Sequence, residues 1–435
     1  MKNNKEHKTA LPELRFPEFR DAEGWKLTPL YTIGDTYGGL TGKTAKDFGQ
    51  GKPYLTYKQI FSSSRIDLTK CEYVNIENNE SQNTVEVGDV LITMSSETAE
   101  EIAFASTLLE EPKNSTYLNS FCFGFRVNNK GKFRPQFLRY LFRSPEYRKS
   151  VGVLAQGATR YNISKTTFKS LDFFIPQDYK EQQKIADCFS SLDDLISAVA
   201  DKIEALKEYK KGLMQRLFPT EGSTVPILRF PEFQNAGKWY KKRIKDLKLD
   251  IITGFAFKGN DISELKNGIR LMRGINITEG YIRHTDDIDR YYSGSTERLS
   301  KYFLKINDLV IGMDGSKVGK NLALITDIDS KSLLVQRVAR LRSQNVSLIK
   351  FLFQQINSSR FFSYVDRINT SSGIPHISQK QIEEFMVWIP DDGLEIKKIG
   401  DLLTSIDDQI LAETQKLDQL KAHKKGLMQR LFPKL

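Results

Sequence analysis

The sequence has few of the residues that stabilise a fold covalently or bind metal ions. Its 435 residues include only three cysteines, Cys71, Cys122 and Cys188, and four scattered histidines. No two cysteines form a CxxC pair, so the pattern indicates neither a disulfide framework nor a zinc site. We expect free, buried thiols in a reducing compartment and no bound metal.

Long apolar runs are also missing. No stretch approaches the roughly 18 consecutive apolar residues of a membrane-spanning helix, and the opening MKNNKEHKTA has no apolar segment behind its lysines. We therefore expect a cytoplasmic protein without a membrane partner. Hydrophobic residues make up 39% and charged residues 27% of the chain. This composition is typical of a folded protein rather than a disordered one.

Positive charge is in excess, and it is unevenly distributed. The chain carries 65 Lys and Arg against 54 Asp and Glu, a formal net charge of +11. Residues 227–390 contain 26 basic and 17 acidic residues, whereas residues 12–176 contain 21 and 19. A basic balance on a folded segment favours a polyanionic partner such as nucleic acid.

The chain contains one unit twice, at an offset of 214 residues. The hexapeptide LRFPEF occupies residues 14–19 and 228–233, and the decapeptide KKGLMQRLFP occupies residues 210–219 and 424–433. A tryptophan, Trp25 or Trp239 respectively, follows each hexapeptide at the same offset. Such a repeat predicts two copies of one structural unit.

Between the matched ends the two copies diverge. Residues 34–160 and 254–374 share little beyond VGDVLITM (87–94) and INDLVIGM (306–313). Short β-rich runs punctuated by Gly, Asn and Ser predict an α+β fold for both variable parts. Each part ends in Ile-Pro, at residues 175–176 and 389–390, where proline marks a break before a helix.

A heptad pattern follows each Ile-Pro break. The apolar spacing alternates between four and three residues, which is the seam of a coiled coil. Roughly 37 residues at about 1.5 Å each give a rod of about 55 Å, although two ordinary amphipathic helices packed on their own domains remain the alternative. Lys210, Glu413 and Lys424 interrupt the seam, and polar seam residues set register. The first seam consists of Ile185, Phe189, Leu192, Ile196, Val199, Ile203, Leu206, Leu213 and Leu217.

The connectivity predicts how the two helices pair. Only residues 220–227 separate the first KKGLMQRLFP from the second LRFPEF, so the first helix ends where the second copy begins. Pseudo-symmetry then requires the second helix to end beside the first LRFPEF, which makes the pair antiparallel. Two unlike, net-basic domains at a fixed separation suit two unlike half-sites of duplex DNA, whose major groove recurs about every 34 Å.

Taken together, these elements resemble the specificity subunits of type I restriction-modification systems. The resemblance rests on LRFPEF followed by Trp, a Gly-Asp pair before an apolar strand, an Ile-Pro ending, and a long helix that begins near EQQKIA and closes with KKGLMQRLFP. It covers nearly the whole chain. It implies an α+β fold with two pseudo-symmetric globular target-recognition domains separated by an antiparallel coiled coil of two long helices. The corresponding segments are 12–180 (domain 1), 181–218 (helix 1), 219–227 (linker), 228–394 (domain 2) and 395–432 (helix 2).

The resemblance also implies a division of labour among subunits. Such a subunit is non-catalytic, recognises a bipartite asymmetric site in double-stranded DNA, and carries two adenine methyltransferase (M) subunits and, in the restriction complex, two motor-nuclease (R) subunits. S-adenosylmethionine, ATP and Mg²⁺ are then expected only in those partners. The residues agree, since the sequence contains no (N/D)PP(Y/F/W) tetrad. The P-loop-like GGLTGKT at residues 38–44 has Tyr37 where a glycine is required.

Candidate DNA contacts lie in glycine-containing basic loops. In the second domain, residues 312–320 follow a strand and resemble the family's loop at this place; backbone N–H groups and lysines there suit phosphates. In VQRVARL, one arginine is expected to face DNA and the other to form an internal ion pair, and arginine suits guanine O6/N7. Segments 157–165 and 371–380 offer polar donors and bases, or alternatively are turns whose Ser and Asn cap the next helix. The predicted DNA-binding residues are Arg160, Tyr161, Asn162, Lys165, Ser316, Lys317, Lys320, Arg337, Arg340, His376 and Lys380.

The equivalent loop of the first domain, residues 93–101, lacks glycine and is acidic. Its Glu97 either accepts from cytosine N4 or is a solvent-facing carboxylate. The identical LRFPEF and KKGLMQRLFP copies indicate a surface used twice, once for each of two identical partners. The predicted partner-binding residues, which alternatively pack within the coiled coil, are Lys210, Met214, Phe218, Lys424, Met428 and Phe432.

Overall fold

The computed structural model describes residues 8–154, 160–315, 317–369 and 375–435. Its compact units are Met1–Ala198 with Leu417–Leu435 (unit 1) and Val199–Lys416 (unit 2). Each unit contains one α+β head and parts of both long helices, which confirms the predicted fold class. We call the heads the first head, in unit 1, and the second head, in unit 2. Within the described residues no helix is both long and apolar enough to cross a membrane.

The central sheet is the same in the two heads, although their sequences differ. In the first head its strand order is β3-β10-β6-β8, and in the second head it is β14-β21-β18-β19, antiparallel throughout. The middle strands are buried on both faces, which explains their unbroken apolar runs. The strands are β3 (Gly34–Gly38), β6 (Val90–Thr93), β8 (Ala105–Thr107), β10 (Cys122–Val127), β14 (Asp250–Thr253), β18 (Leu309–Gly312), β19 (Leu322–Leu324) and β21 (Val338–Arg342).

A second, smaller sheet is also shared. It places a parallel strand pair, β4·β9 or β16·β20, beside an antiparallel neighbour, β5 or β17. In the second head β15 (Ile262–Ser263) extends this sheet. The two variable parts therefore have one topology, which the sequence patterns did not predict. The strands are β4 (Phe48–Leu55), β5 (Glu72–Val74), β9 (Tyr117–Leu118), β16 (Ile269–Met272), β17 (Tyr291–Tyr292) and β20 (Leu333–Leu334).

The shared Asp of the two matched strand motifs explains why these motifs survive divergence. Asp89 and Asp308 have 0% and 1% of their surface exposed. Asp89 binds Arg126 through two hydrogen bonds of 3.0 and 2.7 Å, and Asp308 binds Arg342 through two of 2.6 Å. Each also accepts from the backbone N–H three residues earlier, which fixes the turn before the strand. A buried carboxylate is stable only with such partners.

The ends of each repeat meet in a small antiparallel sheet. β2 (Trp25–Pro29) pairs with β12 (Asp172–Ile175), and β13 (Tyr240–Arg243) pairs with β22 (Met386–Ile389). β1 (Thr9–Ala10) adds a third strand to the first of these sheets. The matched segments at the two ends of each repeat therefore close each head at the point where a long helix begins.

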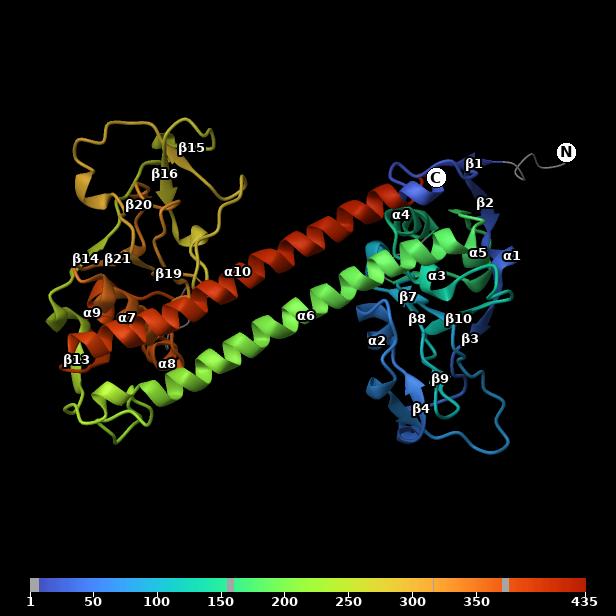
Figure 1. Ribbon diagram of the computed structural model, residues 1–435, viewed down its shortest axis with the longest axis horizontal. Helices are drawn as coiled ribbons and strands as arrows, with labels where there is room; N and C mark the ends of the chain where they lie inside the picture. The colour runs from blue at the N-terminus through green and yellow to red at the C-terminus, as the bar shows by residue number, and fades with distance from the viewer. Residues whose placement is uncertain (1–7, 155–159, 316, 370–374) are drawn as a thin grey trace. The chain divides into compact units, whose positions relative to one another are not determined.

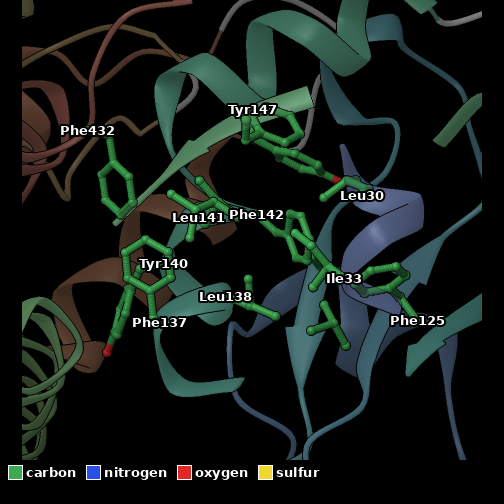
Figure 2. Close-up of a cluster of buried hydrophobic side chains, with 14 of the residues drawn as sticks. Leu30, Ile33, Phe125, Phe137, Leu138, Tyr140, Leu141, Phe142, Tyr147 and Phe432 are labelled. Carbon is green, nitrogen blue, oxygen red and sulfur yellow. The ribbon is translucent and has the colours of Figure 1, made fainter. Parts of the chain in front are cut away.

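Short helices cover the sheets of each head (Figure 1). They bury aromatic side chains against the central sheet: Figure 2 shows Phe142 and Tyr147 in the same buried cluster as Phe125 of β10. The helices of the first head are α1 (Leu30–Ile33), α2 (Tyr57–Ser62), α3 (Pro135–Leu141), α4 (Pro145–Leu154) and α5 (Lys165–Lys169), and those of the second are α7 (Val346–Ile356), α8 (Ser359–Ile368) and α9 (Gln379–Glu384).

The two long helices are α6 (Tyr179–Leu217) and α10 (Gly393–Leu431), each 39 residues long. They pack together within each unit, as the heptad seam predicted, and they run antiparallel, as the connectivity predicted (Figure 1). The polar seam residues have ionic partners across the pair: Lys424 binds Asp193 in unit 1, and Lys210 binds Asp407 at 2.6 Å in unit 2. Glu413 likewise binds Lys202 at 2.5 Å. These paired positions explain how a seam with charged residues keeps its register.

Both hexapeptides attach a head to the end of a long helix. The Leu14 N–H donates to the Arg430 carbonyl at 2.9 Å, and the Leu228 N–H donates to the Arg216 carbonyl at 2.8 Å. This confirms that the second helix ends beside the first LRFPEF. The KKGLMQRLFP decapeptide and LRFPEF are thus two halves of one joint, present once in each unit.

The arginine of each hexapeptide forms a buried ion pair with the start of a long helix. Arg15 binds Glu181 through two 2.8 Å hydrogen bonds, and Arg229 binds Glu395 through two of 2.7 Å. Pairing with these carboxylates raises the pKa of both arginines. In the first head Glu181 also accepts from the Trp25 indole N–H at 3.0 Å. The repetition of LRFPEF in the two units therefore has an internal, structural cause.

Candidate nucleic-acid interface

The structure brings together two segments that sequence analysis proposed separately. In the second head Asp314 forms a β-bridge with His376, and the Ile377 N–H donates to the Met313 carbonyl at 2.8 Å. In the first head β7 (Ser95–Ser96) pairs with β11 (Tyr161–Asn162) in the same way. Each head therefore presents the loop after its central strand beside the segment before α5 or α9.

A third segment, the turn before β10 or β21, completes this surface. The Met94 N–H donates to the Phe121 carbonyl, and the Met313 N–H donates to the Arg337 carbonyl, both at 2.9 Å. Arg337 was predicted as a DNA contact, but Phe121 was not. The signal for Phe121 is available only from tertiary structure, since the two turns share no residue pattern.

In unit 2 the loop after β18 and the turn before β21 border a cleft of about 1060 Å³ between the second head and the unit's segments of α6 and α10. Lys317 and Arg337, both predicted contacts, line it. So do Arg273 and Arg283, which the sequence analysis missed because they lie outside the segments 312–320, 335–341 and 371–380 that it singled out. A concave surface with clustered basic groups is the electrostatic arrangement that binds a phosphate backbone.

Two basic side chains of the cleft, Lys317 and Arg337, pair with carboxylates at exposed positions. Lys317 pairs with Glu279 at 3.0 Å, and both side chains are more than half exposed. Arg337 pairs with Asp314 at 2.9 Å with 68% of its side chain exposed. Exposed pairs of this kind contribute little to stability, so a phosphate or a base edge can replace the carboxylate.

The other predicted contacts of the second head divide into three groups. His376 and Lys380 are exposed beside the bridge, and Lys320 lies over the Phe362 ring, 5.8 Å from its centroid. Ser316 lies outside the described residues. Ser378 caps α9 through Gln381, so the capping interpretation of this segment is confirmed alongside its exposed basic residues.

Arg340 does not fit the prediction that it contacts DNA. It is 1% exposed, pairs with Asp250 and donates to the Lys301 carbonyl at 3.1 Å. Burial lowers the pKa of its guanidinium. Of the two arginines in VQRVARL, Arg340 is therefore the internal one, because its position in β21 points it into the head, and Arg337 is the exposed one.

The first head presents a different set of side chains. Arg160, Asn162 and Lys165 are exposed and Tyr161 is partly buried. The Arg160 guanidinium lies over the ring of Phe121, 5.6 Å from its centroid. Ser164 caps α5 by accepting from the Thr167 N–H at 3.0 Å. Glu97, in the acidic loop, is exposed to solvent.

The predicted partner-binding residues are used within each unit. Met428 and Phe432 are 8% and 4% exposed in the core of unit 1, where Figure 2 shows Phe432 beside Phe137 and Tyr140. Met214 and Phe218 pack against the core of unit 2, and Lys210 and Lys424 form the seam ion pairs. The exposed residues of the two decapeptides are instead Lys211, Gln215, Arg216, Lys425, Gln429 and Arg430.

Comparison with known proteins identifies the family. The family described as "Type I restriction modification DNA specificity domain" matches residues 23–208 and again residues 236–422. The chain belongs to this family. The two matches repeat the internal duplication, and each spans one head and most of one long helix.

Individual type I specificity proteins agree with this assignment. The MjaVIII specificity subunit of Methanocaldococcus jannaschii is 25% identical over 67% of this chain and 69% of its own length. The MjaIX specificity subunit of the same organism is 22% identical over 94% and 92%, respectively. The crystal structure of the type I S subunit from M. genitalium has the same fold, with a TM-score of 0.67 at 13% identity, covering 98% of this chain and all of that one.

The protein is thus the DNA specificity subunit of a type I restriction-modification system. Such a subunit is non-catalytic and carries no cofactor, because S-adenosylmethionine, ATP and Mg²⁺ belong to the methyltransferase and restriction subunits.

Proposed function

We propose that this specificity subunit recognises a bipartite, asymmetric site in double-stranded DNA, one half-site with each head. In the second head the candidate surface consists of the cleft arginines and lysines, with His376 and Lys380 beside them. In the first head it consists of Arg160, Tyr161, Asn162 and Lys165. Basic side chains would supply affinity through phosphates, and exposed side chains at the three converging segments would supply sequence preference.

One observation carries this proposal. The heads share two sheets, with the same strand order and equivalent backbone hydrogen bonds, yet they present different side chains at equivalent places. Identical heads would favour a palindromic site, whereas one scaffold with two surfaces favours two unlike half-sites.

The proposed partners are two M subunits and, in a restricting complex, two R subunits, in the cytoplasm. Support for a pair of identical partners comes from the joint that occurs once in each unit. We assign docking to the exposed residues of the two decapeptides, with Gln215 and Gln429 at equivalent positions. The predicted anchors Met428 and Phe432 are buried in the core of unit 1, so they would stabilise this surface by packing beneath it rather than contact the partner.

Neutralising the cleft should weaken DNA binding without changing its sequence preference. We expect the double variant Lys317→Gln, Arg283→Gln, assembled with M subunits, to bind matched and unmatched duplexes more weakly. The plot of the logarithm of its binding constant against the logarithm of salt concentration should have a slope shallower by roughly 2. The reason is that each lost phosphate contact reduces the magnitude of this slope by about 0.9. Affinity measured at several salt concentrations tests this expectation.

The control is Lys242→Gln with Lys305→Gln, which removes the same charge from exposed positions outside the cleft. It should leave the slope of the unmodified complex nearly unchanged. If the cleft variant keeps the original slope, or if both variants lose the same amount, the cleft is not the phosphate-binding surface.

The long helices are proposed to set the spacer between the half-sites. Seven residues inserted in register into both α6 and α10 preserve the seam and lengthen each helix by about 10 Å. Since base pairs stack about 3.4 Å apart, we expect methylome sequencing to show the same half-sites with a spacer longer by about three base pairs.

Insertion into α6 alone is the control, because it misaligns the Lys210–Asp407 and Lys202–Glu413 pairs and should abolish methylation. An unchanged spacer in the double insertion, with activity retained, would show that helix length does not determine spacing.

A further inference from the structure

Two residues that share nothing in sequence occupy one position in the common scaffold. The Leu40 N–H donates to the Leu118 carbonyl at 2.7 Å, and the Phe255 N–H donates to the Leu334 carbonyl at 2.9 Å, which aligns the turn after β9 with the turn after β20. Three residues further along each turn lie Phe121 and Arg337.

The strands that follow confirm the alignment. β10 begins opposite Thr93, with the pair Cys122–Thr93, and β21 begins opposite Gly312, with the pair Val338–Gly312. Together with the equivalent hydrogen bonds from the Met94 and Met313 N–H groups, these contacts allow only one alignment of the two turns with each other. Phe121 and Arg337 are therefore structural equivalents.

Both side chains are displayed to solvent rather than used in the fold. Phe121 is 52% exposed, and the Arg337 side chain is 68% exposed. Arg337 has a φ of 65°, a left-handed conformation that is uncommon for residues other than glycine. The left-handed backbone at Arg337 makes this position a candidate for a functional role, and in both heads the exposed side chain is accessible to a ligand.

The residues that contact Arg337 and Phe121 also differ between the two heads. In the second head Asp314 holds the Arg337 guanidinium at 2.9 Å. In the first head the equivalent residue is Ser95, which follows Met94 as Asp314 follows Met313, and it offers no carboxylate. Arg160 instead lies over the Phe121 ring. Each exposed side chain therefore has its own orienting partner.

We infer that this shared position determines sequence specificity, with Arg337 and Phe121 each contacting a base edge in a different half-site. Arg337 and Phe121 cannot share a phosphate-binding role, because the phenylalanine side chain has no hydrogen-bond donor or positive charge to bind a phosphate. Contact with base edges can be common: arginine donates to guanine O6 and N7, and an aromatic ring contacts the thymine methyl group. This inference rests on the proposed DNA-binding role of each head.

The test is selection of bound sites from a duplex library randomised in both half-sites, using the subunit assembled with M subunits. Arg337→Phe should lower the preference for one guanine by about 10- to 100-fold. The other positions of that half-site and the whole of the second half-site should keep their preferences. Phe121→Arg should change one position of the opposite half-site, away from thymine.

Matched controls are Arg298→Phe in the second head, which is the same exchange as Arg337→Phe, and Tyr73→Arg in the first, which also replaces an exposed aromatic residue with arginine. Neither control should alter the selected site. A thermal melt of each complex separates loss of fold from loss of preference.

The inference is overturned if Arg337→Phe weakens all sequences equally, which would make Arg337 a phosphate contact, or if both half-sites change together. An unchanged selected site would also overturn it. Each of these results leaves the proposed function standing, whereas failure of that function would appear as the absence of any selected bipartite site with the unmodified complex.

Discussion

Replacing Glu395 with alanine is expected to destabilise unit 2 by about 3 to 5 kcal/mol, the cost of leaving one member of a buried ion pair without its partner. Glu395 is 0% and the Arg229 side chain 6% exposed. The equivalent Glu181→Ala should cost more, because Glu181 also accepts from the Trp25 indole. Chemical denaturation of the variants measures both losses.

Two control variants make this expectation specific. Glu232→Ala removes an exposed pair with Lys398 on the same two segments and should leave the unfolding midpoint nearly unchanged. Replacing both buried partners, Arg229→Met with Glu395→Leu, should recover most of the lost stability, because no unpaired charge remains. If Glu395→Ala unfolds at the same denaturant concentration as Glu232→Ala, the pair does not secure the joint.

Replacing Phe432 with alanine should destabilise unit 1 by about 3 to 5 kcal/mol, because it empties a large site in a closed aromatic cluster. The Phe432 ring lies 5.7 Å from Phe137, 6.0 Å from Trp25 and 6.2 Å from Phe189. Its repeat partner Phe218 is only partly buried, so Phe218→Ala should cost less. Equal losses in the two variants would contradict this account of the joint.

This packing determines how partner docking should be tested. A charged residue at Phe432 would unfold the joint, so loss of methyltransferase binding there would not identify a docking contact. The informative variants are Gln215→Glu and Gln429→Glu, which change exposed residues of the same decapeptides. We expect them to keep the unfolding midpoint and to weaken methyltransferase binding; unchanged binding would place docking elsewhere.

Local regularities were accessible from the sequence. The heptad seam predicted α6 and α10, and the short linker between the decapeptide and the next hexapeptide predicted their antiparallel pairing. Both predictions depend only on neighbouring residues or on chain connectivity, which sequence records directly. The matched Gly-Asp and Asn-Asp motifs marked the buried carboxylates Asp89 and Asp308, although their arginine partners are separated from them by more than 30 residues.

The roles of individual side chains were less accessible. Arg337 and Arg340 are three residues apart, and only the turn before β21 decides that one is exposed and the other buried. Phe432 was predicted at a docking surface because its decapeptide is repeated, but repetition is equally the signature of a joint used twice. The burial of Phe432 depends on residues that are distant in the chain, here Trp25 and Phe137, so no local sequence pattern predicts it.

By itself, the sequence determined that this protein is a duplicated α+β unit with two long paired helices, because repeats and periodicity are properties of the linear chain. Only the tertiary structure decided that the divergent heads share one strand order, that LRFPEF and KKGLMQRLFP form a joint, and that Phe121 and Arg337 are equivalent. The physical reason is that backbone hydrogen bonds fix a scaffold without constraining the side chains it displays, so two sequences can differ at almost every exposed position and still fold alike.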